Sequence, residues 1–184
     1  MNKHYHFIGI GGIGMSALAN ILLQKGVKVS GSDVAVSPII EELQRQGAEI
    51  YIGHASQNII SGSTIVYSSD IREENPEIKE AKRLLLPFLH RSQLLQQLMC
   101  GYYPLLVTGT HGKTTTSSLL AHVLFDVNFR PAYAVGGIIR SLNSNGGYGT
   151  GSYFVAEADE SDGSFLNYTP YGAIITNVDN DHLA

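Results

Sequence analysis

The sequence predicts an α/β protein in which parallel strands alternate with helices. Short apolar runs, bounded by glycine or polar residues, alternate along the chain with stretches of helical periodicity. Two glycine-rich turns, at residues 9–14 and 108–114, each connect such an apolar run to a helix. The chain has 184 residues, of which 43% are hydrophobic, and this suffices for a sizeable core.

The first part of the chain alternates strands with helices. A proline after an N-cap residue, as in Ser37-Pro38 and Asn75-Pro76, marks the start of a helix, and Ser92 is a candidate cap for another. The first helix should bury one face, formed by Ile13, Ala17, Leu18, Ile21 and Leu22. We expect strands at 4–10, 27–33, 48–53, 63–69 and 84–90, and helices at 13–25, 39–46, 76–83 and 93–99.

The periodicity breaks near residues 100–104, where we place a domain junction, giving domains 1–101 and 102–184. A strand at 104–108, a turn and a helix at 114–125 open the second domain. Residues 140–152 are rich in Gly, Ser and Asn and should form a loop. Two further strands are expected, at 153–158 and 172–177.

Composition excludes several classes of protein. The net charge of −4 argues against nucleic-acid binding, which calls for a basic face. Glycines interrupt the apolar N-terminus, so we expect neither a signal peptide nor contact with a membrane. Cys100 is the only cysteine, which excludes internal disulfides and favours a reducing compartment, so we expect a cytoplasmic protein.

The first glycine turn reads GIGGIG and fits G-x-G-x-x-G in its required context between a strand and a helix. Glycine lets a diphosphate approach the backbone, and the helix N-terminus offers N–H groups to it. Asp33 ends the next strand, 19 residues after Gly14, where a carboxylate can bond a ribose hydroxyl. This predicts a Rossmann-like domain that binds NAD or a nucleotide sugar. Alternatively, the glycines serve only strand–helix packing.

The second glycine turn lies in VTGTHGKTTT, where Val107 occupies the position of the first glycine of a P-loop, G-x-x-x-x-G-K-[ST]. We expect Val107 to lie in the preceding strand, so that a shorter turn is sufficient. Gly112 frees the backbone, Lys113 supplies a charge for the β- and γ-phosphates, and Thr114 can hold Mg²⁺. An ordinary glycine turn is the alternative, but a lysine at a helix N-terminus is unfavourable without an anion.

Acidic residues gather in the second half of the chain. Six of the seven after residue 100 fall in two runs, Glu157–Asp162 and Asp179–Asp181. Each run follows a predicted strand, and the carboxyl ends of parallel strands meet at one edge of a sheet. Because clustered carboxylates repel one another unless a cation is bound, the runs predict a MgATP site beside the loop at 108–114. A solvated acidic loop is the alternative. His182, beside the second run, is a candidate metal ligand.

The combination of motifs resembles the Mur ligases of peptidoglycan synthesis over essentially the whole chain: GIGGIGMSALA, GSD, YSSDI, ENPE, GTHGKTTT, AEADESDGSF and TNVDNDH. The resemblance implies a UDP-sugar-binding domain at 1–101 and part of a P-loop α/β ATP-binding domain at 102–184. Family members continue through the rest of that domain and a third domain. We therefore expect a truncated chain that cannot turn over alone.

The resemblance also implies substrates and a reaction. ATP, with Mg²⁺, would phosphorylate the lactyl carboxylate of UDP-N-acetylmuramate, and the amine of L-alanine would attack the acyl phosphate. A related ligase that adds a recycled tripeptide to the same sugar nucleotide is the nearest alternative. An NAD-dependent oxidoreductase or a non-catalytic nucleotide-sugar binder would use only the first glycine turn.

The family pattern assigns residues to each role. Lys113, Glu157 and His182 would be catalytic, and Thr114, Glu157 and His182 would hold metal. ATP would lie against Gly109, Thr110, His111, Gly112, Lys113, Thr114 and Thr115. The UDP-sugar would contact Gly9, Gly11, Gly12, Ile13, Gly14, Met15, Asp33, Ser68, Ser69 and Arg91. For Arg91, a solvent-exposed surface arginine is the alternative.

Overall fold

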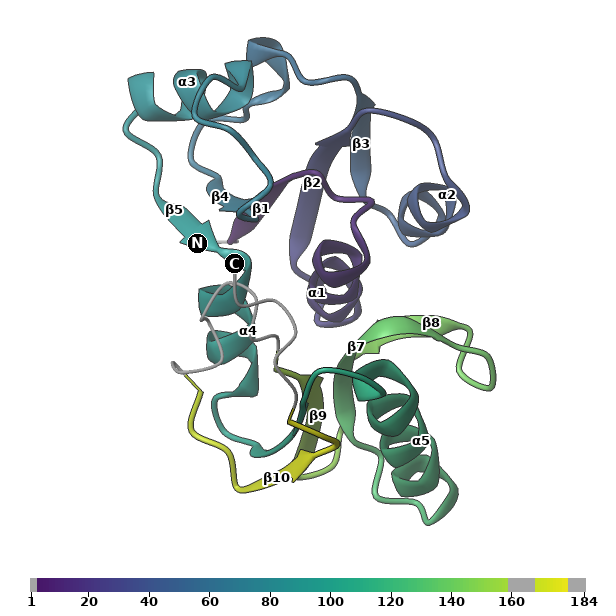
Figure 1. The fold of residues 1–184 in the computed structure, drawn as a ribbon. Helices are drawn as coiled ribbons and strands as arrows, with labels where there is room; N and C mark the ends of the chain where they lie inside the picture. The colour runs from purple at the N-terminus through teal and green to yellow at the C-terminus, as the bar shows by residue number, and fades with distance from the viewer. Residues whose placement is uncertain (1–2, 159–167, 179–184) are drawn as a thin grey trace. The chain divides into compact units, whose positions relative to one another are not determined.

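The computed structural model describes residues 3–158 and 168–178 and divides the chain into two compact units, Met1–Leu94 and Leu95–Ala184 (Figure 1). Each unit is built on its own five-stranded sheet. This confirms the α/β class, with a Rossmann-like N-terminal unit and a second α/β unit after it.

The sheet of the first unit is entirely parallel and has the order β3-β2-β1-β4-β5. Its strands are β1 (His4–Ile8), β2 (Lys28–Asp33), β3 (Glu49–Ile52), β4 (Thr64–Tyr67) and β5 (Phe88–His90). The helices are α1 (Ile13–Gln24), α2 (Pro38–Arg45), the 3-10 turn η1 (Ser56–Asn58), α3 (Pro76–Arg83) and α4 (Arg91–Met99), which runs into the second unit. Two of the three expected caps are present, because Ser37 accepts from the Ile40 amide and Asn75 accepts from the Glu77 amide.

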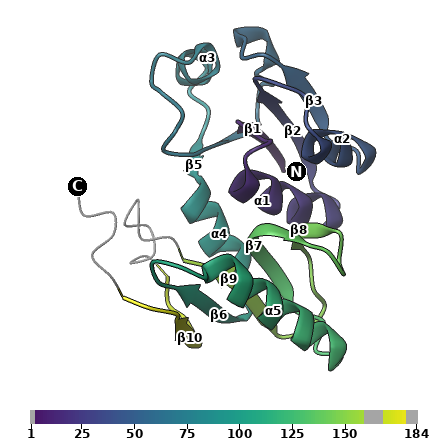
Figure 2. The ribbon, with the colours of Figure 1, turned by 45° about the vertical axis from the view of Figure 1, so that its right-hand side comes forward.

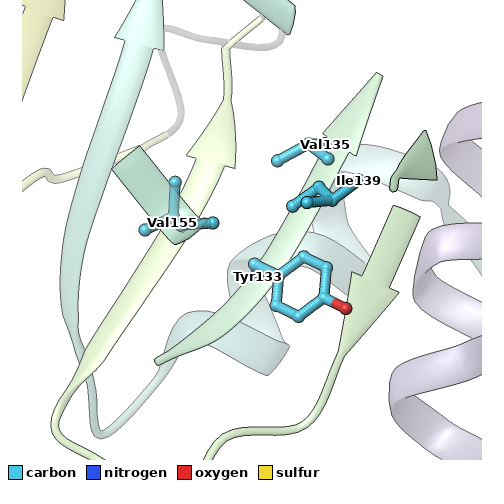
Figure 3. Close-up of a cluster of buried hydrophobic side chains, with 5 residues drawn as sticks. Tyr133, Val135, Ile139 and Val155 are labelled. Atoms are coloured by element: carbon cyan, nitrogen blue, oxygen red, sulfur yellow. The ribbon is translucent and has the colours of Figure 1, made fainter. Parts of the chain in front are cut away.

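The sheet of the second unit has the order β10-β6-β9-β7-β8, parallel except for the β7–β8 pair. Its strands are β6 (Tyr103–Thr108), β7 (Ala132–Ile139), β8 (Ser144–Gly147), β9 (Tyr153–Glu157) and β10 (Gly172–Ile175). Helix α5 (Lys113–Asp126) packs along β6, β7 and β9 (Figure 2). Beneath it, a buried cluster joins the helix to the sheet through Ala121, Tyr133, Val135, Ile139 and Val155 (Figure 3).

Several expectations for local structure were wrong. The expected loop at 140–152 contains β8, and β7 was missed because the pair Gly136-Gly137 interrupts its apolar run. The strand expected at 84–90 is only Phe88–His90, because Leu85 takes a positive φ of 53° just after α3 and is 91% exposed. Ile13 is 39% exposed rather than on the buried face of its helix.

The start of α4 also differs from expectation. The helix begins at Arg91, so Ser92 lies in its first turn instead of capping it. The His90 ring takes the capping position, since its Nδ1 accepts from the Ser92 amide at 3.4 Å and contacts the Ser92 hydroxyl at 2.7 Å. Gln93 in turn accepts from the His90 amide. A histidine cap gives no signal in the sequence comparable to that of serine.

Candidate functional site

The first glycine loop lies at the point where the strand order of its sheet reverses. From β1 the chain proceeds to β2 and β3 on one side, and β4 and β5 lie on the other. Open parallel sheets bind ligands outside the carboxyl ends of the strands at such a point. The predicted UDP-sugar residues follow the carboxyl ends of four of these strands, β1, β2, β4 and β5. The topology therefore brings them to one edge.

Backbone hydrogen bonds hold the first loop against the end of β2. The amides of Gly9 and Ile10 both donate to the Ser32 carbonyl, at 2.8 and 3.0 Å, and Gly9 has a φ of 81°. The N-cap residue of α1 is Gly12, which has no side chain that could cap the helix. Met15 is only 3% exposed, so it presents almost no surface to a ligand. The loop therefore presents backbone to its surroundings.

Asp33 braces this loop. Its Oδ2 accepts from the Gly11 amide at 2.7 Å and its Oδ1 accepts from the Val34 amide at 2.7 Å. A Cβ at Gly11 would lie 2.9 Å from Asp33 Oδ2, so glycine is required for this approach. Each carboxylate oxygen has a second lone pair, which can accept a hydrogen bond from a ribose hydroxyl. The predicted contact between Asp33 and a ribose stays a prediction.

The other predicted substrate residues of this unit lie near the ends of β4 and β5. The Ser69 hydroxyl contacts His90 Nε2 at 3.2 Å, and the Ser68 hydroxyl donates to Asp70 at 3.5 Å. Arg91 reaches the glycine loop, because a Cβ at Gly14 would lie 3.3 Å from its Nη1. A guanidinium beside a helix N-terminus is suited to a diphosphate.

The second glycine loop connects β6 to α5, and Val107 lies in β6, as expected. Gly109 and Gly112 take positive φ angles of 124° and 79°, which gives the short turn its shape. Lys113 Nζ donates to the Gly109 carbonyl at 2.6 Å and contacts the Thr110 carbonyl at 3.4 Å. The cation is therefore folded over the loop, where a phosphate would need it. Thr115 is exposed in the first turn of α5.

Two residues that directly follow β10, Thr176 and Asn177, hold this loop as a clamp, and neither was among the predicted ATP-binding residues. Asn177 accepts from the His111 amide at 2.9 Å and donates to the His111 carbonyl at 3.0 Å. The Thr176 hydroxyl donates to the same carbonyl at 2.6 Å. A Cβ at Gly109 would lie 2.3 Å from Thr176 Oγ1, so only glycine fits under the clamp. In the sequence, these two residues could have been found as a Thr-Asn pair that directly follows an apolar strand.

Glu157 ends β9 against the start of α5. Its Oε1 accepts from the buried Ser117 hydroxyl at 2.7 Å and from the Gly136 amide at 2.6 Å. Its Oε2 accepts from the Thr114 hydroxyl at 3.1 Å. A Cβ at Gly136 would lie 2.7 Å from Glu157 Oε2, which explains the glycine in β7. The sequence analysis missed Ser117 and Gly136, although the latter belongs to a glycine pair in an apolar strand.

This arrangement brings two predicted metal ligands together, Thr114 and Glu157. Hydroxyl and carboxylate oxygens are the ligands that Mg²⁺ takes, so the pair fits that ion. Within residues 3–158 and 168–178, no group of three or more His, Cys, Asp or Glu side chains could hold a metal. Five of the six predicted acidic partners lie outside the described residues, namely Asp159, Glu160, Asp162, Asp179 and Asp181, and so does His182.

Family models match both parts of the chain. The Mur ligase family catalytic domain matches residues 4–103, and the Mur ligase middle domain matches residues 107–184. This chain belongs to the Mur ligase family. The expected domain boundary, between residues 101 and 102, stays a prediction. The compact units of the structure divide between Leu94 and Leu95, and the two family matches are separated by residues 104–106. No helix in the described part of this Mur ligase chain is long and apolar enough to cross a membrane.

Curated relatives of this Mur ligase chain include the UDP-N-acetylmuramate–L-alanine ligases of Protochlamydia amoebophila and Aquifex aeolicus. The first is 60% identical over 183 residues, covering 100% of this chain and 40% of the relative. The second is 48% identical over 181 residues, covering 98% of this chain and 40% of the relative. The chain thus spans about two-fifths of the length of these relatives.

Solved structures give the same family. The UDP-N-acetylmuramate–alanine ligase of Thermotoga maritima superposes with a TM-score of 0.91 at 35% identity, covering 98% of this chain and 42% of that one. The Neisseria meningitides ligase for UDP-N-acetylmuramate and L-alanyl-γ-D-glutamyl-meso-diaminopimelate has a TM-score of 0.92 at 29% identity, with coverages of 100% and 63%. The fold alone therefore does not separate the two ligases.

Proposed function

We propose that this chain is part of a UDP-N-acetylmuramate–L-alanine ligase, an ATP-dependent enzyme that forms an amide bond in peptidoglycan synthesis. The observation that carries the proposal is the second glycine loop, where Lys113 lies over the loop and Thr114 meets Glu157 at 3.1 Å. A glycine turn that only joined a strand to a helix would need neither the lysine nor the carboxylate. The names of the curated relatives support the choice of amino acid.

The proposed chemistry divides between the two units. Gly9–Met15, Asp33, Ser68, Ser69 and Arg91 would hold UDP-N-acetylmuramate at the edge of the first sheet. Gly109–Thr115 would cradle the phosphates of ATP, and Lys113 would neutralise charge as the γ-phosphoryl group passes to the lactyl carboxylate. Amide formation then releases phosphate when the amine of L-alanine attacks the acyl phosphate.

A bound Mg²⁺ would supply positive charge beside the phosphates, and Thr114 Oγ1 and Glu157 Oε2 are the described oxygens suited to it. Ser117 and the Gly136 amide both bond Glu157 Oε1, which leaves Oε2 turned towards Thr114. His182 remains a proposed partner for a metal on the basis of the family pattern.

Calorimetric titration of the 184-residue chain tests the substrate assignment. We expect it to bind UDP-N-acetylmuramate, and to bind MgATP independently. NADH should not bind. NADH binding without any response to UDP-N-acetylmuramate would overturn the proposal in favour of an oxidoreductase, which would leave the second glycine loop without a role.

Turnover is a separate test. We propose that these 184 residues do not release ADP by themselves when given UDP-N-acetylmuramate, L-alanine and MgATP, because their relatives are about two and a half times as long. A coupled ADP-release assay measures this, and robust turnover would contradict the proposal. Comparing L-alanine with the tripeptide as acceptor in the full-length enzyme separates the two candidate ligases.

A further inference from the structure

A buried carboxylate lies behind the first glycine loop and has no part in the function proposed above. Glu77, in the first turn of α3, is 0% exposed. Its Oε2 accepts from the Ser32 hydroxyl at 2.5 Å, and its Oε1 accepts from Asn58 Nδ2 at 2.6 Å. The Ala55 amide also donates to Oε1, at 3.4 Å. A carboxylate is this deeply buried only when such donors satisfy it.

Two histidines complete the surroundings of Glu77. His54 Nδ1 lies 3.4 Å from Glu77 Oε2 and 2.9 Å from the Ser32 hydroxyl. His6, buried in β1, has its Nε2 3.8 Å from the same carboxylate oxygen, and its Nδ1 contacts the Ser30 hydroxyl at 2.8 Å. The carboxylate therefore gathers polar groups from β1, β2, the segment after β3 and η1.

Ser32 connects this cluster to the glycine loop. Its hydroxyl donates to Glu77, while its backbone carbonyl accepts from the amides of both Gly9 and Ile10. The next residue, Asp33, accepts from the Gly11 amide. The position of Ser32 thus determines where the loop backbone lies. Hydrogen bonds to a charged carboxylate are stronger and more directional than neutral ones, so Glu77 can hold Ser32 in place.

We propose that Glu77 is a positioning residue for the first glycine loop, acting through Ser32 to hold the loop backbone in the geometry that receives a diphosphate. The proposal rests on the proposed function as far as the ligand is concerned. Glu77 itself touches no ligand, because it is fully buried beneath the sheet edge.

The test uses Glu77→Gln, which keeps the shape of the side chain and removes its charge. One acceptor oxygen becomes a donor, so Asn58 and Ser32 can no longer both donate as they do now. We expect affinity for UDP-N-acetylmuramate to fall about tenfold, with MgATP binding unchanged. Glu80→Gln is the matched control, since Glu80 lies on the same helix and pairs with Arg83 on its outer side. An unchanged UDP-sugar affinity in folded Glu77→Gln would overturn the proposal.

A second variant separates positioning from a general loss of stability. Ser32→Ala removes the hydroxyl that receives the effect of Glu77 but keeps the carbonyl that binds the loop. If Glu77 acts through Ser32, then Glu77→Gln will weaken UDP-sugar binding much less in the Ser32→Ala background than in the wild type. Effects that add independently in the double variant would contradict the proposed route.

Hydrogen exchange provides a readout that needs no ligand. In Glu77→Gln, the Gly9 and Ile10 amides should exchange faster than in the wild type, while amides of the second unit keep their rates. Unchanged exchange at Gly9 and Ile10 would overturn the positioning role. If the wild-type chain failed to bind UDP-N-acetylmuramate but exchange at these amides still rose in the variant, the proposed function would fail and the positioning role would stand.

Discussion

In the loop between β1 and α1, glycine amides donate to the Ser32 carbonyl and the Asp33 carboxylate, so acceptors of the protein hold the loop. In the loop between β6 and α5, Lys113 lies over the turn and the Thr114 hydroxyl meets Glu157. Both loops expose backbone at a helix N-terminus, which suits phosphates. The second carries a cation and candidate metal ligands in addition, as phosphoryl transfer requires. Similar glycine turns therefore support different chemistry because of the side chains around them.

Removing the cation of the second loop should have the largest effect. In Lys113→Ala we expect affinity for MgATP to fall about 100-fold, because a charged partner of the phosphates is lost. Binding of UDP-N-acetylmuramate should be unchanged. Calorimetry on both ligands measures this, with Lys79→Ala as a control for the loss of one exposed lysine. An equal fall in UDP-sugar affinity would break the proposed division between the two loops.

The clamp on the second loop predicts different outcomes for two neighbouring glycines. Gly109→Ala should lower the free energy of unfolding by about 2 kcal/mol or more, because the new Cβ would meet Thr176 and Asn177 at a positive φ. Gly112→Ala should cost only about 1 kcal/mol, since its Cβ would meet nothing within 4 Å and backbone strain alone remains. Denaturant titration compares them, and equal losses would exclude the clamp.

The contact between Glu157 and Thr114 makes a smaller and more specific prediction. In Glu157→Gln, the factor by which Mg²⁺ raises the affinity for ATP should be about tenfold smaller than in the wild type, because a neutral amide is a poorer ligand for a hard cation. No metal ligand is predicted at the first loop, so UDP-sugar binding should not depend on Mg²⁺. Titrations with and without the ion decide this, and a Glu157→Gln chain with full Mg²⁺ dependence would remove Glu157 from the metal site.

The smallest expected effect concerns pH and the first loop. Burial raises the pKa of Glu77, but the His6 ring nearby and the hydrogen bonds from Ser32 and Asn58 outweigh it, so the net pKa lies below the ordinary value. A carboxyl with a lowered folded pKa stabilises the fold above its unfolded pKa, and this contribution is lost as the pH falls through the folded pKa. Thermal unfolding from neutral to acidic pH should show this loss in the wild type.

The matched variant for that measurement is Glu77→Gln, which has no proton to gain. Its melting temperature should depend less on acid than that of the wild type, over the range in which Glu77 titrates. His6 and His54 face the same carboxylate and are retained in the variant. Identical pH profiles for the two proteins would contradict a charged Glu77 in the native state.

Local sequence patterns predicted much of the first unit. The alternation of strands and helices, the caps at Ser37 and Asn75 and the glycine turn at 9–14 all depend on residues close together in the chain. Expectations went wrong where distant residues decide the structure. Strand β8 is polar and pairs only because β7 lies beside it. Strand β7 carries two glycines because a Cβ at Gly136 would meet Glu157 and a Cβ at Gly137 would meet Thr114.

The sequence by itself determined that the chain has two glycine turns, one with a lysine and one without, and that each lies between a strand and a helix. Those features follow from backbone freedom and local charge. Only the tertiary structure decided that Asn177 and Thr176 clamp the second loop, that Glu157 meets Thr114, and that Glu77 supports the first loop through Ser32. These contacts join residues 43 to 66 positions apart, and no local pattern encodes them because parallel pairing brings distant strand ends together.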